Sequence, residues 1–197
     1  MPSLKPLIVF LPPAPHTGAF FDRVRTCFGD VRTDALTYPG YGDNPAITQP
    51  SISGYADALV QDLPDGAILV GFHTGNLVAA EIAKRMSIAQ IVMIDIPYFD
   101  RDTRDTYAAK LTDDPAKDAF RAAFAYDPFI GFLEIPCPVS VLATQSGLLE
   151  PTRLAAKALG VSLTERMDVT APVFETHAKE MAAEILSAIK LGHEGTG

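Results

Sequence analysis

The 197 residues carry a formal net charge of −8, with 48% hydrophobic and 20% charged side chains. This composition provides enough apolar surface for one core, and the acidic charge without a Lys/Arg cluster argues against nucleic acid as a partner. No apolar run approaches the roughly 20 residues that span a bilayer, so we expect a single cytoplasmic domain over residues 1–197, not a membrane protein.

Short apolar segments alternate with helix-like ones along the chain, a pattern typical of a parallel sheet covered by helices on both faces. The predicted strands are residues 7–11, 31–36, 68–72, 91–95, 139–143 and 163–169. Apolar residues three and four positions apart predict helices over residues 55–63, 77–86, 152–159 and 179–190. Both cysteines, Cys27 and Cys137, lie beside apolar segments, which predicts inert core thiols.

One stretch interrupts the alternation of strands and helices. Residues 97–136 lie between two predicted strands, are too long for a single crossover and hold two charged helical segments. Phe120 and Phe124 are spaced to lie on one face of the second segment. We interpret the stretch as an inserted helical lid. The alternative is an irregular crossover that covers the edge of the sheet.

The third predicted strand runs into the sequence Gly71-Phe72-His73-Thr74-Gly75, and a helical segment follows directly. Strand, sharp turn and helix with this glycine spacing form the nucleophile elbow, G-x-S-x-G, here with histidine in place of serine. The two glycines serve the geometry of the turn, because a Cβ at either position would clash.

Further segments in the same order make the chain resemble the α/β-hydrolase family over nearly its whole length. They are residues 6–21, similar to the first strand and oxyanion loop, residues 35–45 with their Tyr-Pro-Gly-Tyr-Gly run, residues 92–95, and residues 137–139. The resemblance implies an α/β fold with a six-stranded, mainly parallel sheet in the order 2-1-3-4-5-6, numbered along the chain. It also implies a pocket at the carboxyl ends of the strands, under the lid and above His73.

The resemblance does not extend to the catalytic triad. Beyond residues 139–143 the family places an aspartate, whereas this chain reads Thr-Gln-Ser-Gly-Leu-Leu before Glu150. The family's catalytic histidine corresponds to a position near Ala171, several residues before His177. We therefore expect an atypical triad.

His73 is the central candidate, with two interpretations. Its imidazole could act as a base or a nucleophile, with the backbone amides of Thr74 and Ala14 as the oxyanion hole. Alternatively, histidine preserves the turn without chemistry, because it is one of the residues that tolerate a positive φ.

Four other residues have a functional and a structural interpretation each. His177 assists His73 or is a solvated residue at a helix start, and Asp95 is the triad acid or caps local backbone. His16 faces the pocket or lies in an exposed turn, and Tyr98 forms a pocket wall or packs the lid on the sheet. A metal site formed by the three histidines has no support in their spacing, so we expect neither metal nor cofactor.

Two functions follow from the resemblance. The first is an enzyme acting on a small ester, thioester or lactone, with a cofactor-free lyase or proton-transfer enzyme as a variant. The second is a non-catalytic protein of the same fold, a pseudoenzyme that binds a small molecule or a partner, because serine, acid and histidine are missing together. The fold alone does not choose between them.

Overall fold

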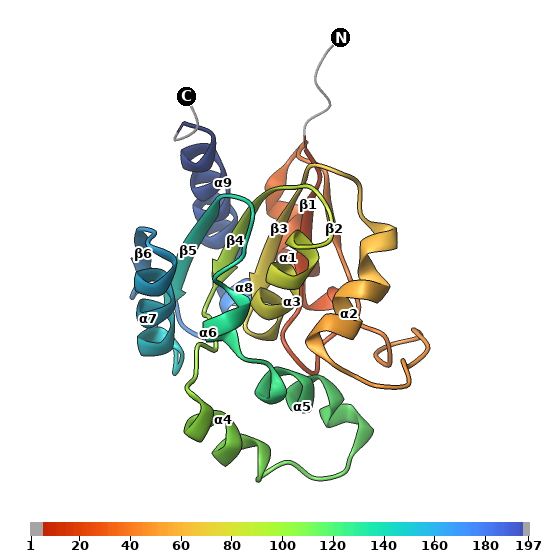
Figure 1. The fold of residues 1–197 in the computed structure, drawn as a ribbon. Helices are drawn as coiled ribbons and strands as arrows, with labels where there is room; N and C mark the ends of the chain where they lie inside the picture. The colour runs from red at the N-terminus through yellow and green to blue at the C-terminus, as the bar shows by residue number, and fades with distance from the viewer. Residues whose placement is uncertain (1–5, 195–197) are drawn as a thin grey trace.

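Six parallel strands form one sheet in the order β2-β1-β3-β4-β5-β6 (Figure 1). The computed structural model describes the backbone of residues 6–194 and the side chains of residues 6–189. The strands are β1 Ile8–Leu11, β2 Thr33–Ala35, β3 Ala67–Phe72, β4 Ile88–Ile94, β5 Val139–Thr144 and β6 Leu163–Arg166. The structure confirms the predicted strand order, and every pairing is parallel.

Helices cover both faces of the sheet, because alternate strand residues point to opposite faces and the central strands are apolar on both. On one face Val9, Leu69 and Met93 share a buried cluster with α2 (Ile52–Leu59), α3 (Thr74–Ala83) and α7 (Leu149–Leu159). On the other face the intervening residues Phe10 and Val70 pack on α1 (Asp22–Arg25), α8 (Val173–Thr176) and α9 (Ala178–Glu194).

Local signals explain where several helices begin and end. The Ser51 hydroxyl accepts a hydrogen bond from the amide of Gly54 (2.9 Å) at the start of α2. Gly160 adopts a left-handed conformation, φ 68°, just after α7, where such a residue typically ends a helix. Helix α3 begins at Thr74, three residues earlier than predicted, because it starts directly at the end of the turn.

The short helical elements were not predicted, because a single turn holds too few residues to show a helical period. In the described part of the chain they are α1, α6 (Pro128–Gly131), α8 and the 3-10 turns at Gly18–Phe21, Thr26–Phe28, Val60–Asp62 and Pro115–Lys117. Among the described residues, no helix is long and apolar enough to cross a membrane.

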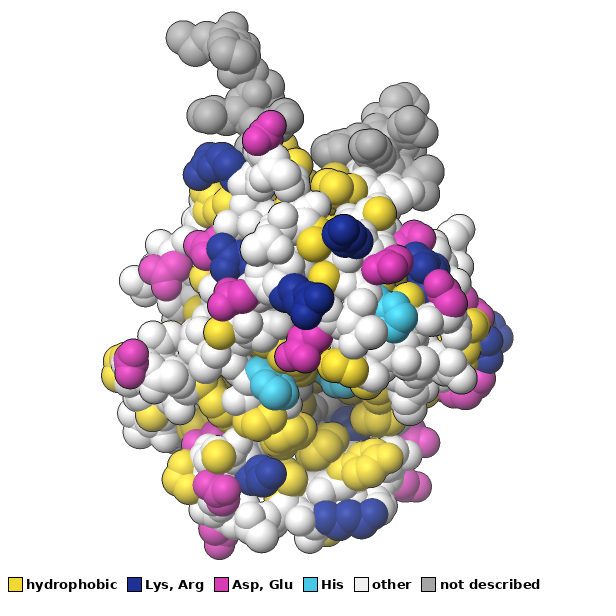
Figure 2. Space-filling view, turned by 180° about the vertical axis from the view of Figure 1, so that it is seen from behind, with side chains coloured by type: hydrophobic (Ala, Val, Ile, Leu, Met, Phe, Trp, Pro, Cys, Tyr) yellow, Lys and Arg dark blue, Asp and Glu magenta, His cyan; other side chains and the backbone are white. Residues whose placement is uncertain are grey.

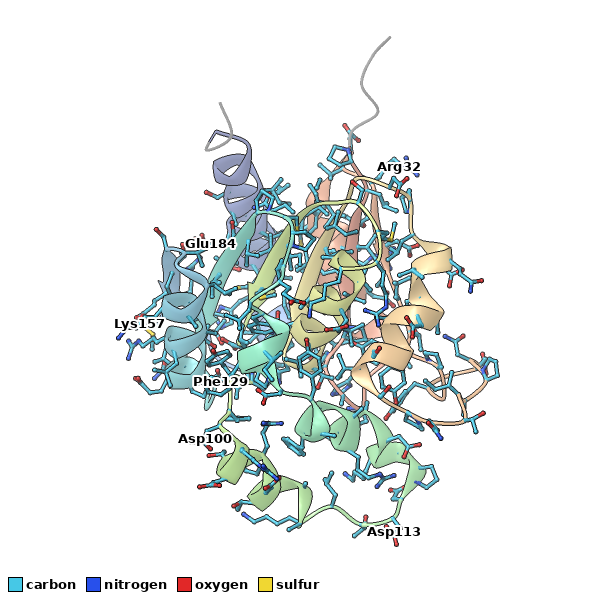
Figure 3. All side chains as sticks on the ribbon, in the orientation of Figure 1. Arg32, Asp100, Asp113, Phe129, Lys157 and Glu184 are labelled. Carbon is cyan, nitrogen blue, oxygen red and sulfur yellow. The ribbon has the colours of Figure 1, made fainter. Side chains whose placement is uncertain are left out.

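Residues 97–136, called here the 97–136 segment, lie beyond the carboxyl ends of the strands, at the bottom of Figure 1. They contain α4 (Arg101–Ala108), α5 (Asp118–Ala125) and α6 (Pro128–Gly131). Figure 3 shows Asp100 where α4 begins and Asp113 on the outermost loop, far from the sheet. Phe129, in contrast, lies close to the sheet. The segment therefore projects beyond the carboxyl-end edge of the sheet, between β4, which precedes it, and β5, which follows it.

Candidate functional site

The site begins at a corner formed by residues 71–75. Strand β3 ends at Phe72, α3 begins at Thr74, and between them His73 has φ 51° and ψ −117°. The His73 amide donates to the carbonyl of Ile94 (3.2 Å). The structure thus contains the predicted corner, with histidine at its tip.

The two glycines of this corner are needed for close packing. A Cβ on Gly71 would lie 2.7 Å from the Asn76 nitrogen, and one on Gly75 would overlap the Leu11 carbonyl. Asn76 is fully buried; its amide group donates to the Ile94 carbonyl (2.8 Å) and accepts from the Ile94 amide (3.1 Å). Sequence analysis missed Asn76, whose signal is a polar residue within an otherwise apolar helix.

Two cavities meet at His73. The larger, about 480 Å³, is lined by aromatic rings including Phe20, Phe72 and Phe174, and the smaller, about 130 Å³, lies towards the 97–136 segment. Figure 2 shows a hollow walled by hydrophobic side chains, with histidine side chains near its upper edge. Both cavities lie at the carboxyl ends of β3 and β4, as the sequence predicts for the pocket.

Burial controls the ionisation of His73. It lowers the pKa of the imidazole to about 4, the nearby Asp95 carboxylate acts in the opposite direction, and His16 lowers the pKa further. Nε2 of His73 is buried and has no hydrogen-bond partner in the described structure. The ring is therefore neutral at neutral pH, and the residue lines both cavities.

Asp95 lines the larger cavity, but its hydrogen bonds lead to β5. The residue is fully buried with φ 48°, and its carboxylate accepts from the Thr144 amide (2.8 Å) and the Thr144 hydroxyl (2.6 Å). Both oxygens thus bind the neighbouring strand. The expected cap on local backbone does not describe this geometry, because the partner lies 49 residues along the chain, and the acid role stays a prediction.

The structure places His177 outside the lining of both cavities. The residue follows α8, and its amide donates to the Val173 carbonyl (3.2 Å). The preceding residues Ala171, Pro172 and Phe174 line the larger cavity instead. His177 therefore does not line a cavity together with His73, and its assistance to His73 stays a prediction.

The remaining predicted residues divide between the cavities and the core. His16 lines the larger cavity and packs its ring on Phe20, with centroids 4.8 Å apart. Thr74 and Ala14 line the smaller cavity. Tyr98 lines neither; it is buried against Phe129 and Phe132, which is the packing interpretation.

Solved structures share this architecture over nearly the whole chain. A hydrolase from Pseudomonas aeruginosa superposes with a TM-score of 0.78 at 14% identity, covering 94% of this chain and 90% of the other. A lipase-esterase related protein from Clostridium acetobutylicum gives 0.76 at 15% identity, covering 94% and 95%. The chain has the α/β-hydrolase fold.

Sequence comparison of this α/β-hydrolase-fold protein finds a short match. It is 42% identical over 66 residues to the pimeloyl-[acyl-carrier protein] methyl ester esterase of Aromatoleum aromaticum, 32% of this chain and 25% of the esterase. The matched region thus spans about a quarter of that relative's length. No family model matches the chain.

Arg104 also lines the smaller cavity and is only 8% exposed, although the sequence did not single it out. It belongs to the charged run Arg-Asp-Thr-Arg-Asp-Thr, which has the pattern of a solvent-facing helix. Its burial depends on the 97–136 segment folding back on itself, so no local signal could have revealed it.

The thiols and the acidic groups are not arranged for metal binding or thiol chemistry. Both cysteines are unpaired and only partly buried, and burial raises the pKa of Cys137 to about 11. Within the described part of the chain, no group of three His, Cys, Asp or Glu side chains could hold a metal ion. Of the three histidines considered for such a site, only His16 and His73 line the same cavity.

Proposed function

We propose that this protein hydrolyses a small ester, thioester or lactone, with His73 as the nucleophile. The main support is the neutral imidazole at the tip of the corner between β3 and α3, which corresponds to the serine position of the nucleophile elbow. The esterase and hydrolase neighbours share the fold, and the short match is to an esterase.

In the proposed reaction an unprotonated nitrogen of His73 attacks the carbonyl carbon of the substrate. The carbonyl oxygen becomes an oxyanion, for which the Thr74 and Ala14 amides beside the smaller cavity are the proposed donors. When the carbonyl re-forms, the bond to the leaving oxygen or sulfur breaks, the leaving group takes a proton from water, and the imidazole loses its other N–H proton to solvent. Water then attacks the acyl-imidazole, the carbon–nitrogen bond breaks, and the acid is released.

The electrostatics favour a nucleophilic role over a general-base role for His73. A general base is most efficient when its pKa lies near the operating pH, whereas burial lowers the pKa of His73 to about 4. The Asp95 carboxylate, which would stabilise an imidazolium, is already bonded to Thr144. Nucleophilic attack requires the neutral ring, and this condition is met throughout the neutral range.

The 97–136 segment serves in this proposal as a lid. Its residues Phe99, Phe120 and Phe124 form apolar walls of the smaller cavity, opposite Thr74 on α3. A wall of this kind excludes water from the reacting carbonyl and strengthens the interaction of the oxyanion with its donors.

The test is hydrolysis of p-nitrophenyl acetate and butyrate by the wild type, His73→Ala and His177→Ala. We expect His73→Ala to fall to the background of uncatalysed hydrolysis. His177→Ala should retain wild-type activity, since that imidazole lies outside both cavities. Equal rates in the wild type and His73→Ala would contradict the proposal.

Non-catalytic binding of a small apolar ligand is the second candidate. The observation in its favour is that Asp95 is bonded to Thr144 and His177 lies outside the cavities, so His73 has no second catalytic side chain hydrogen-bonded to it in the described structure. Saturable ligand binding in the cavities without ester turnover would support this function over hydrolysis.

A further inference from the structure

Arg104 places a buried positive charge with an unused donor at the smaller cavity. The residue is 8% exposed, and its Nε is buried without a hydrogen-bond partner. A charged donor without an acceptor is costly to bury. Because Arg104 is one of the residues that line the cavity, an acceptor bound there could satisfy this group.

The other contacts of the guanidinium involve Nη1 and Nη2 and leave Nε without an acceptor. Nη1 donates to the carbonyls of Tyr126 (2.7 Å) and Phe124 (3.4 Å), which hold the side chain in place. The ion pair joins Nη2 to Asp127 at 3.4 Å, and the Asp127 side chain is 42% exposed. Asp127 is therefore a carboxylate that reaches solvent and competes with any bound anion for the charge of Arg104.

A second positive feature lies at the same cavity. Thr74 is the first residue of α3, and the amides of a first helical turn carry partial positive charge. The remaining walls of the cavity are apolar, and none of its described lining residues is acidic. The larger cavity, in contrast, is lined by Asp95 and Glu175. A negative group is therefore favoured in the smaller cavity and opposed in the larger one.

We propose that the smaller cavity binds the carboxylate of a short organic acid through Arg104, beside the Thr74 amide that the proposed hydrolysis assigns to the oxyanion. The apolar remainder of such a ligand would extend past the neutral His73 into the aromatic cavity. If the proposed hydrolysis also holds, the substrate is a half-ester of a short dicarboxylic acid. The smaller cavity has a volume of about 130 Å³, so it accommodates only an acid with a short carbon chain.

Calorimetric titration of the full chain with butyrate and butyramide tests the proposal, since the two differ in charge and neither is an ester. We expect butyrate to bind at least about tenfold more tightly, the scale of a hydrogen bond to a charged group. Arg104→Gln should remove this preference. The matched control is Arg101→Gln on the same helix, whose side chain is 85% exposed, and it should keep the preference.

A second variant separates binding from a purely structural role of Arg104. Asp127→Asn leaves Arg104 in place and keeps an oxygen to accept from the Phe129 amide at the start of α6. Because it removes the competing carboxylate, we expect tighter butyrate binding and unchanged butyramide binding. Equal affinity for the two probes, an unchanged preference in Arg104→Gln, or no butyrate binding at millimolar concentration would overturn the proposal. Lack of ester turnover with butyrate binding retained would overturn only the proposed function.

Discussion

His73 combines a backbone requirement and a chemical property in one residue. The corner needs a positive φ, which histidine tolerates, and burial keeps the ring neutral. A buried nitrogen without a hydrogen-bond partner lowers the free energy of unfolding, and a corner with a purely structural role could avoid this loss of stability. Asparagine would meet the backbone requirement without the titratable group.

This cost predicts a pH dependence of stability. The pKa of His73 is about 4 in the folded chain and ordinarily about 6.5, so between these values the unfolded chain binds more protons. The free energy of unfolding should therefore rise as pH increases from 4 to 6.5, by about 3 kcal/mol from this residue. Urea unfolding of the wild type and His73→Asn measures it; the wild-type curve should be the steeper, and parallel curves would refute the assignment.

Gly75 sets the closest approach of α3 to β1. Gly75→Ala would drive a Cβ into the Leu11 carbonyl, and relieving such an overlap costs about 1–3 kcal/mol. The control is Gly147→Ala, because a Cβ there meets no atom within 4 Å. Denaturant midpoints should separate the two variants; a Gly75→Ala protein as stable as Gly147→Ala would show that the corner does not need this glycine.

At the scale of elements, the 97–136 segment is joined to the body through Tyr126. The tyrosine hydroxyl donates to Glu81 on α3 (2.8 Å), and Lys84 (2.8 Å) and Arg85 (2.7 Å) hold the same carboxylate. Burial and the adjacent carboxylate both raise the pKa of Tyr126, so the hydroxyl remains a donor. This network fixes the end of α5 over α3.

Removing the hydroxyl should weaken that attachment. We expect Tyr126→Phe to lower the free energy of unfolding by about 1 kcal/mol and to increase hydrogen exchange in α4 and α5. Tyr107→Phe is the matched control, since Tyr107 is 41% exposed. The same loss of stability in both variants would mean that the contact with Glu81 does not hold the segment.

The elements that could be predicted from the sequence are those with a strong local pattern. Apolar runs identify β1, β3, β4 and β5, and the paired glycines identify the corner, because close packing there leaves no room for a side chain. The edge strands β2 and β6 are mostly polar and shorter than predicted. Three features of the site depend on contacts between distant segments. They are the hydrogen bonds between Asp95 and Thr144, the burial of Arg104, and the position of His177 outside the cavity wall. Such contacts leave no periodic signal in a single sequence.

For the whole molecule, the sheet brings the functional candidates together at one edge. The chain leads from the ends of β1, β3 and β4 directly into Ala14, His73 and Asp95, because parallel strands end on the same side. The 97–136 segment contributes walls, including Arg104, to the smaller cavity at that edge, whereas the aromatic cavity is lined by other residues. His73 lines both, so a ligand bridging them would pass the imidazole.

The proposed reaction requires that His73 forms a covalent acyl intermediate. The most direct measurement is mass spectrometry of the wild type mixed with p-nitrophenyl butyrate, quenched in acid during the first turnovers and digested. We expect a butyryl group on His73 in the peptide that contains residues 71–75, and no such group in His73→Ala. Rapid turnover with no acyl group on that peptide, or with the group on another residue, would contradict it.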